Sequence, residues 1–245
     1  DILSLKVEEL VSKIKDSQLT SVEICKKYID RVNEFEKDVK AWVHFNKKLL
    51  LEKAAEADEH RRSGKPTGPL HGIPVAVKDI IGTLDMPTEC GTVIRKGKSY
   101  SQNAEIVDLL LSAGAIVMGK TATSELAYLG PSKTTNPHDY TRTPGGSSSG
   151  SAASVASFMA PLSIGSQTGG SVIRPASYCG VVGYKPTYGL ISRNGVLKTS
   201  EKLDHIGVFG RSVEDVALIA KVLIKKDNYD SATVHYSTEN MLDEV

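Results

Sequence analysis

The chain has 245 residues, of which 40% are hydrophobic and 24% are charged, and its formal net charge is +1. This balance is ordinary for a globular protein with one large domain or two small ones, and it carries no electrostatic footprint for nucleic acid or an anionic membrane surface. The longest apolar stretches, such as Ala115–Met118 and Val213–Ile224, are short or interrupted by charge, so no transmembrane helix is expected.

The cysteines and histidines predict neither disulfides nor a metal site. Cys25, Cys90 and Cys179 stand far apart without paired spacing, which is typical of reduced cysteines in a cytoplasmic protein. The histidines show no ligand spacing such as HExxH, so we expect no metal and no cofactor. The chain begins at Asp1 rather than Met, which indicates a trimmed, processed or excised N-terminus.

Residues 1–64 are predicted to form a helical N-terminal segment. Thr20 to Glu23 is a capping-box pattern that precedes apolar residues on one helical face. A second helix, rich in Ala, Glu and Lys, runs from Lys47 to about Ser63 and stops at Gly64.

From residue 65 onward, short apolar runs alternate with helices, which indicates an α/β fold around a largely buried sheet. Pro74–Lys78 is predicted to be a buried strand with a lysine at its end. The other predicted elements are a helix at Glu105–Ala113 capped by Gly114, a strand at Ala115–Met118, and helices at Ser151–Phe158 and Ser212–Ile224. The polar stretch from Lys226 to Val245 is predicted to be an irregular connector.

Glycine and serine are unusually dense between Pro144 and Ser171. Flexible linkers share this composition. Here, however, the apolar Ala152–Ile164 segment separates two compact Gly/Ser turns, which favours a folded core over a linker.

The stretch from Gly114 to Thr121 satisfies the letter pattern of a phosphate-binding P-loop. A P-loop needs a polar or glycine-rich loop whose backbone amides face the phosphate. The four residues between Gly114 and Gly119 are apolar and follow a helix, so we expect them to form a buried strand and no nucleotide site.

Gly146 to Gly150 also fits the nucleophile-elbow pattern of α/β-hydrolases, centred on Ser148. That elbow must follow a strand directly and needs an acid and then a histidine later in the chain. The preceding residues include Pro144 and are unsuited to a strand, and the only later histidines are His205 and His235. The elbow is therefore the weaker alternative.

Three segments instead resemble the amidase signature family: Lys78 at a strand end, Ser147 in a Gly-Gly-Ser turn, and Ser171 after Gly169-Gly170. Further stretches match in the same order, namely Gly72–Asp79, Asn136-Pro137, Pro144–Ala153, Arg174–Ala176, Cys179–Gly189, Leu203–Arg211 and Val213–Asp215. The separation between Ser147 and Ser171, 171 − 147 = 24, also fits the family pattern.

The resemblance implies an amide hydrolase with Ser171 as the acylated nucleophile, Ser147 as the proton relay and Lys78 as the base. It implies a cis peptide bond before Ser147. It also implies an oxyanion hole formed by the backbone amides of Thr168, Gly169, Gly170 and Ser171.

Elementary chemistry supports these roles. A serine hydroxyl is a poor nucleophile unless a neighbouring base removes its proton. Lysine can be that base only when neutral, and burial against Val75 and Val77 is expected to lower its pKa. Glycines at 169 and 170 let backbone N–H groups converge on a developing oxyanion.

The resemblance also implies an amidase-type mixed sheet flanked by helices. Family domains run about twice this length, so we expect the fold to be incomplete in this chain. Residues 65–245 would be the catalytic core portion of one amidase domain, with its C-terminal half absent.

Two positions depart from the family pattern. The family often has an acidic residue where this chain has Gln167, and an arginine two residues after the nucleophile. Here Ile173 takes that place and the arginine is Arg174. These changes bear on the substrate class rather than on the chemistry.

Three functions stay open. The first is a stand-alone amidase that acts on a small-molecule amide, with a homodimer as the candidate assembly. The second is the glutamine-hydrolysing A subunit of a tRNA-dependent amidotransferase, which works with partner subunits and without direct contact to nucleic acid. The third is an inactive fragment or binding module. Gln167 and the shifted arginine favour the first.

Overall fold

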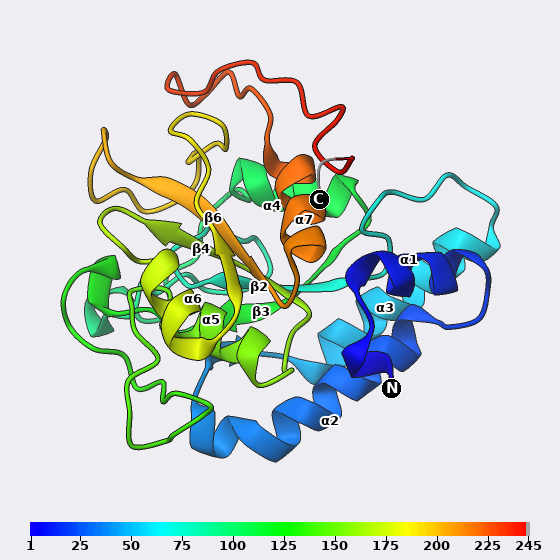
Figure 1. Cartoon of the computed structure of the whole chain (residues 1–245), viewed down its shortest axis with the longest axis horizontal. Coiled ribbons are helices and arrows are strands. Elements are labelled where there is room, and N and C mark those ends of the chain that lie inside the picture. Colours follow the sequence, from blue (N-terminus) through cyan, green and yellow to red (C-terminus); the bar gives the residue numbers. More distant parts are fainter. Residues whose placement is uncertain (244–245) are drawn as a thin grey trace.

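The structure is a computed structural model that describes residues 1–243. A mixed β-sheet crosses the centre of the protein (Figure 1). Within the described residues the sheet has six strands in the order β1-β3-β2-β4-β6-β5. The strands are β1 (Trp42–Phe45), β2 (Pro74–Lys78), β3 (Ile116–Thr121), β4 (Leu162–Gln167), β5 (Val182–Tyr184) and β6 (His205–Gly210).

The three central strands set the geometry of the site. β2 pairs in parallel with both β3 and β4, whereas β1, β6 and β5 join in antiparallel pairs. The carboxyl ends of β3, β2 and β4 therefore meet at one edge of the sheet, which is where α/β proteins place their ligands.

Helices cover both faces of this sheet (Figure 1). α4 (Glu105–Ser112) and α7 (Val213–Leu223) pack together against β3 and β6, and α5 (Ser149–Ala156) and α6 (Ile173–Cys179) pack together against β4 and β5. α1 (Val7–Lys15) and α3 (Lys47–Arg62) lie at the right of the picture, and α2 (Ser21–Val39) runs along its lower margin. The predicted α/β fold with a mixed sheet flanked by helices is confirmed.

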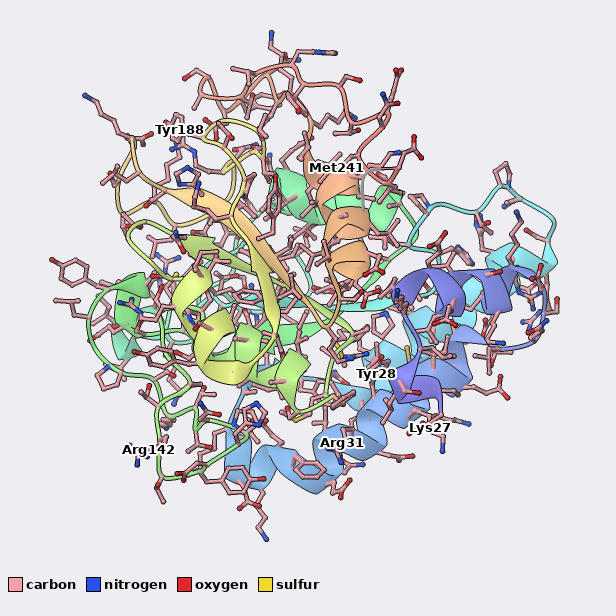
Figure 2. All side chains as sticks on the ribbon, viewed as in Figure 1. Lys27, Tyr28, Arg31, Arg142, Tyr188 and Met241 are labelled. Carbon is pink, nitrogen blue, oxygen red and sulfur yellow. The ribbon has the colours of Figure 1, made fainter. Side chains whose placement is uncertain are left out.

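Alternation along the strands divides the core into two clusters. In β6, Val208 belongs to the cluster on the α4/α7 side, and the next residue, Phe209, belongs to the cluster with α5 and α6. α2 contributes to both clusters. Figure 2 shows its Tyr28, which is fully buried, and its exposed neighbour Lys27 nearer the outer margin. Burial of a large aromatic side chain contributes strongly to core stability.

Most predicted elements occur where the local sequence places them. The capping box is present, since Thr20 accepts the N–H of Glu23 and the Glu23 carboxylate accepts the N–H of Thr20. Strand β2 has the predicted bounds and α3 ends at Arg62, just before Gly64. The apolar run in the P-loop pattern is strand β3, as predicted, although it continues to Thr121.

Two local differences have clear physical reasons. The sequence interpretation placed only helices in residues 1–64, but Trp42–Phe45 forms strand β1 because it pairs with β3 in the sheet. Helix α5 begins at Ser149 rather than Ser151, because its first turn packs against Ala41 and Ala122 through the bare backbone of Gly150.

The predicted irregular connector, Lys226–Val245, is irregular as far as residue 243, and its last two residues lie outside the described part of the chain. Buried polar groups tie it to the fold. Asp230 accepts hydrogen bonds from the Arg193 guanidinium at 2.9 Å, and Asp227 accepts one from Ser192 at 2.6 Å. No helix within residues 1–243 is both long and apolar enough to cross a membrane.

Candidate active site

Lys78 lies at the carboxyl end of β2, and its side chain is fully buried. Its amine donates to three hydroxyl oxygens: Ser147 Oγ at 2.7 Å, Ser166 Oγ at 2.9 Å and Ser148 Oγ at 3.1 Å. Ser147 and Ser148 directly precede α5, and Ser166 lies in β4. The predicted base and the predicted relay are therefore in direct contact.

Strand pairing directs Lys78 toward α5. Lys78 is in register with Thr121, whose hydroxyl lies 2.8 Å from that of Ser151 on α5. Successive side chains of a strand point to opposite faces, so Val77, and Lys120 in register with it, face the other side. On that side, Lys120 donates to the carbonyl oxygen of Ile81 and to the Thr88 hydroxyl. The lysine of the P-loop pattern is thus paired within the protein and does not face a phosphate site.

Gly165 allows the close approach of the serine turn to β4. A Cβ atom at this position would lie 2.6 Å from Ser148 Oγ and 2.8 Å from a ring carbon of Phe209. Only glycine leaves the space that Ser148 occupies.

Burial tunes Lys78 to act as a base. Removal from water disfavours the ammonium form and lowers the pKa of Lys78 from 10.5 to about 7, against the opposing attraction of the Asp204 carboxylate. A large fraction of the amine is therefore neutral near pH 7, as a general base requires.

The hydroxyl of Ser148 has a fixed direction. It donates to the carbonyl oxygen of Ser166 at 3.1 Å and accepts the N–H of Ser166 at 3.2 Å, so toward Lys78 it can only accept. A neutral amine has two N–H groups and one lone pair. The two N–H groups can serve only two of the three surrounding oxygens. The third hydroxyl, which is that of Ser147 or Ser166, must therefore donate its own proton to the nitrogen lone pair.

Ser171 lies in the turn after β4 and is 8% exposed. Its carbonyl oxygen accepts the N–H of Ser148 at 3.3 Å, so the two serine turns are neighbours. Among the hydrogen bonds of residues 1–243, none joins the Ser171 hydroxyl to Ser147. The proton transfer between these two serines stays a prediction.

The turn from Thr168 to Ser171 has the free donors that an oxyanion hole needs. Gln167 Oε1 accepts the N–H groups of Val172 and Ile173 at 2.9 and 3.0 Å. The hydrogen bonds in the described part of the chain leave the N–H groups of Gly169, Gly170 and Ser171 without a partner. These groups are the candidates for binding a developing negative charge, and this role also stays a prediction.

The carboxylate of Asp204 joins the turn that begins at Thr168 to the loop at Thr199 and Ser200. It accepts hydrogen bonds from the Thr168 hydroxyl and from the backbone N–H groups of Thr199 and Ser200. Burial alone would raise the pKa of Asp204, but these hydrogen bonds outweigh it and lower the pKa below 3.8. A permanent negative charge thus lies close enough to favour protonated Lys78.

The implied cis peptide bond is present between Gly146 and Ser147. Of the two departures from the family pattern, the shifted arginine contacts this bond. Ile173 points outward and is 47% exposed, and Arg174 donates from Nε and Nη2 to the Gly146 carbonyl oxygen at 3.1 and 2.9 Å.

The elbow alternative finds no support in the contacts of Ser148. Its hydroxyl bonds to Lys78 and Ser166 rather than to a histidine. His205 lies against Leu203 and Tyr188, and His235 is exposed. Residues 140–146 form no strand. The described residues hold no group of three or more metal-ligating side chains, and Cys25, Cys90 and Cys179 are buried free thiols.

Sequence reasoning missed two contributors to the site. Ser166 lies near the end of β4, in the Gly/Ser-dense stretch, and has no motif of its own that would indicate its contact with Lys78. Asp204 fell within a matched stretch, but its partners Thr168 and Thr199 come from separate loops and could not be paired from sequence.

Comparisons with known proteins show which family the chain is similar to. Residues 23–244 match the Amidase family. The chain is 42% identical over 245 residues to the A subunit of glutamyl-tRNA(Gln) amidotransferase from Natranaerobius thermophilus, an alignment that covers 98% of the chain and 50% of that protein.

Solved structures give the same result. The peptide amidase of Stenotrophomonas maltophilia aligns with a TM-score of 0.92 and 33% identity, over 98% of this chain and 52% of that one. An amidase family protein from Bacillus anthracis aligns with a TM-score of 0.88 and 35% identity, over 95% and 49%. The chain thus spans about half the length of the relatives it matches, and it belongs to the amidase signature family.

Proposed function

We propose that this chain carries the catalytic portion, within residues 65–245, of an enzyme that hydrolyses a small-molecule amide through an acyl-enzyme on Ser171. Ser171 Oγ bonds to the amide carbonyl carbon while its proton moves to Ser147 and the Ser147 proton moves to Lys78. The protonated lysine then returns a proton through Ser147 to the leaving nitrogen as the C–N bond breaks. Water repeats the sequence to release the acid.

The contact between Lys78 and Ser147 carries this proposal. A buried amine with a pKa of about 7 lies 2.7 Å from the Ser147 hydroxyl. Burial alone does not distinguish this lysine, because Lys120 is also buried. What distinguishes Lys78 is its contact with a serine hydroxyl that can pass on a proton, whereas Lys120 donates to a backbone carbonyl and to threonine hydroxyls on the other side of the sheet. The free N–H groups beside Ser171 supply the matching oxyanion site.

A second candidate is the glutamine-hydrolysing A subunit of a tRNA-dependent amidotransferase, in which ammonia passes to partner subunits. The 42% identity to the A subunit of a glutamyl-tRNA(Gln) amidotransferase favours it. The solved peptide amidase, which is similar over 98% of the chain, favours a stand-alone amidase with the same chemistry. A binding module without catalysis is the remaining candidate.

Ammonia release from simple primary amides and from glutamine separates these candidates. We expect hydrolysis by the wild-type protein and none by Ser171→Ala. Activity on simple amides alone indicates an amidase, and activity on glutamine that rises with partner subunits indicates the amidotransferase. Equal background rates for wild type and Ser171→Ala would reject catalysis.

A further inference from the structure

Strand register brings Asp204 to the turn that carries Ser171. β4 and β6 are antiparallel, and their pairing ends at Gln167 and His205. Continuing this register by one residue places Asp204 opposite Thr168, the first residue of the turn. The Thr168 hydroxyl donates to Asp204 Oδ1, so a side-chain hydrogen bond extends the pairing beyond the ends of the two strands.

The Asp204 carboxylate has a full set of donors. Oδ1 accepts the hydroxyls of Thr168 and Thr199, and Oδ2 accepts the backbone N–H groups of Thr199 and Ser200 at 2.6 and 2.9 Å. The two threonine oxygens lie 2.9 Å apart, but each hydroxyl has one proton and gives it to the carboxylate. Thr168 is therefore held by Asp204 itself, through a side chain that is only 8% exposed.

The same carboxylate acts on the base. Ser166, Thr168 and Asp204 line one narrow hollow, and Ser166 contacts the Lys78 amine at 2.9 Å. The charge of Asp204 raises the pKa of Lys78 against the opposing effect of burial. Cys90 acts in the same direction, but its thiol stays neutral near pH 7 because burial raises its pKa. In the described part of the chain, the permanent charge that acts on Lys78 is thus that of Asp204.

We propose that Asp204 is a positioning residue with two separate effects: its hydrogen bond to Thr168 fixes the oxyanion turn, and its charge stabilises the protonated Lys78 that the reaction creates. Donors that are fixed in advance need no reorganisation when the oxyanion forms. An amine beside a negative charge holds a transferred proton more firmly and is the stronger base. This inference rests on the proposed function, because it assigns a residue to the same site.

Asp204→Asn isolates the charge. The amide keeps the shape of the carboxylate, because its oxygen can accept the two backbone N–H groups while its NH₂ group donates to the two threonine hydroxyls. Without the negative charge, the pKa of Lys78 should fall by about one unit. NMR titration of the full chain with lysine isotopically labelled at Cε measures this pKa without any substrate, and Lys78→Met identifies the signal.

Asp227→Asn is the control for the charge. Asp227 is a buried carboxylate that also accepts a serine hydroxyl and a backbone N–H group, from Ser192 at 2.6 Å and Tyr229 at 2.9 Å, but it lies in the stretch after α7. Its variant should leave the pKa of Lys78 unchanged, and Asp204→Glu, which restores the charge, should return this pKa toward the wild-type value. An equal pKa in Asp204→Asn and wild type would overturn the electrostatic effect.

Thr168→Val isolates the hydrogen bond to the turn. We expect kcat for a simple primary amide to fall about 10- to 100-fold with little change in KM, because a displaced oxyanion donor weakens the transition state rather than the substrate complex. The pKa of Lys78 should stay at about 7, because Asp204 keeps its charge. Thr199→Val removes the other hydroxyl from the same oxygen without touching the turn, and its kcat should stay within about threefold of wild type. Equal losses in the two valine variants would overturn the effect on the turn.

The two measurements separate failure of this inference from failure of the proposed function. If wild type hydrolyses no amide but Asp204→Asn still lowers the pKa of Lys78, the proposed function is rejected and the electrostatic effect is supported. If wild type is active but neither variant differs from its control, the inference is rejected and the proposed function stands. Thermal unfolding shows whether each variant folds, and if Asp204→Asn does not, the comparison of Thr168→Val with Thr199→Val decides the inference.

Discussion

Lys78 is the residue whose environment decides the chemistry. Its three hydroxyl neighbours match the three N–H groups of a protonated amine, while burial favours the neutral form. The balance leaves the pKa of Lys78 at about 7, so small changes around it move the base in or out of its active form.

The first prediction concerns the pH profile. Because only neutral Lys78 accepts a proton, kcat/KM should rise about tenfold per pH unit below its pKa of about 7 and level off above it. Lys78→Met should lose about 10²- to 10⁴-fold in rate, and Lys78→Arg should not recover, because arginine stays protonated.

Lys120→Met is the matched control for Lys78, since Lys120 is a buried lysine of the neighbouring strand that faces the other side of the sheet. Its variant should keep the midpoint of the profile near 7, whatever its stability. A near-normal rate in Lys78→Arg would contradict the assignment of the base.

The second prediction concerns Ser166. Its hydroxyl accepts an N–H of Lys78 at 2.9 Å, and a hydrogen bond to the charged form is worth more than one to the neutral form. Ser166→Ala should therefore lower the apparent pKa of Lys78 by about one unit, as well as slow the reaction. Ser166→Thr, which keeps the hydroxyl, should restore the midpoint. A profile that does not move in Ser166→Ala would show that Ser166 is only a packing residue.

At the scale of single elements, close packing of β4 against the start of α5 positions the serines. In Gly165→Ala the new methyl group would lie 2.6 Å from Ser148 Oγ, so either Ser148 or β4 must shift. We expect a loss of about 1–3 kcal/mol in the free energy of unfolding and a loss of activity. Gly130→Ala, whose added Cβ would have its nearest neighbour at 3.9 Å, should change unfolding in urea little. Equal stability of the two variants would contradict this packing.

The sequence predicts elements well where their signals are local. The capping box at Thr20, the breaker at Gly64 and the cap at Ser212 each lie within a few residues of the boundary they define. Strand β1 could not be predicted in this way. Trp42–Phe45 is short, shows no alternation of buried and exposed residues, and is a strand only because β3 lies beside it.

In the candidate site too, residues with local motifs can be predicted from the sequence, and residues that act through long-range contacts cannot. Lys78, Ser147 and Ser171 can be recognised from sequence because each lies within a run of several residues that matches a family motif. Ser166 and the guanidinium of Arg174 act through contacts between segments far apart in the sequence, which only the folded chain reveals.

At the scale of the whole molecule, the chain spans about half the length of its relatives, and the described residues form two buried hydrophobic clusters, one on each face of the sheet. Buried hydrogen bonds from Arg193 to Asp230 join the irregular stretch after Ile224 to the loop that carries Arg193.

Asp230 provides the prediction at this scale. Burial alone would raise its pKa, but hydrogen bonds from Arg193 and Ala232 lower the pKa from 3.8 to about 2. A carboxylate with a depressed pKa stabilises the fold above its unfolded pKa, and this stabilisation is lost as the pH falls toward 2. Asp230→Ala should cost about 3 kcal/mol in urea unfolding at pH 7, and the difference from wild type should shrink between pH 4 and pH 2.

Glu52→Ala is the control for Asp230, because it removes an exposed ion pair with Lys48 and should cost less than about 0.5 kcal/mol. A cost for Asp230→Ala as small as that of Glu52→Ala, or one independent of pH, would show that the stretch after Ile224 is not anchored by this pair.

The central claim is that Ser171 is the nucleophile, and peptide mapping after labelling with a serine-reactive fluorophosphonate tests it most directly. The label should map to Ser171, disappear in Ser171→Ala, and form orders of magnitude more slowly in Ser147→Ala while still mapping to Ser171. A label on Ser148, or a strong dependence of labelling on His205 or His235, would contradict this assignment.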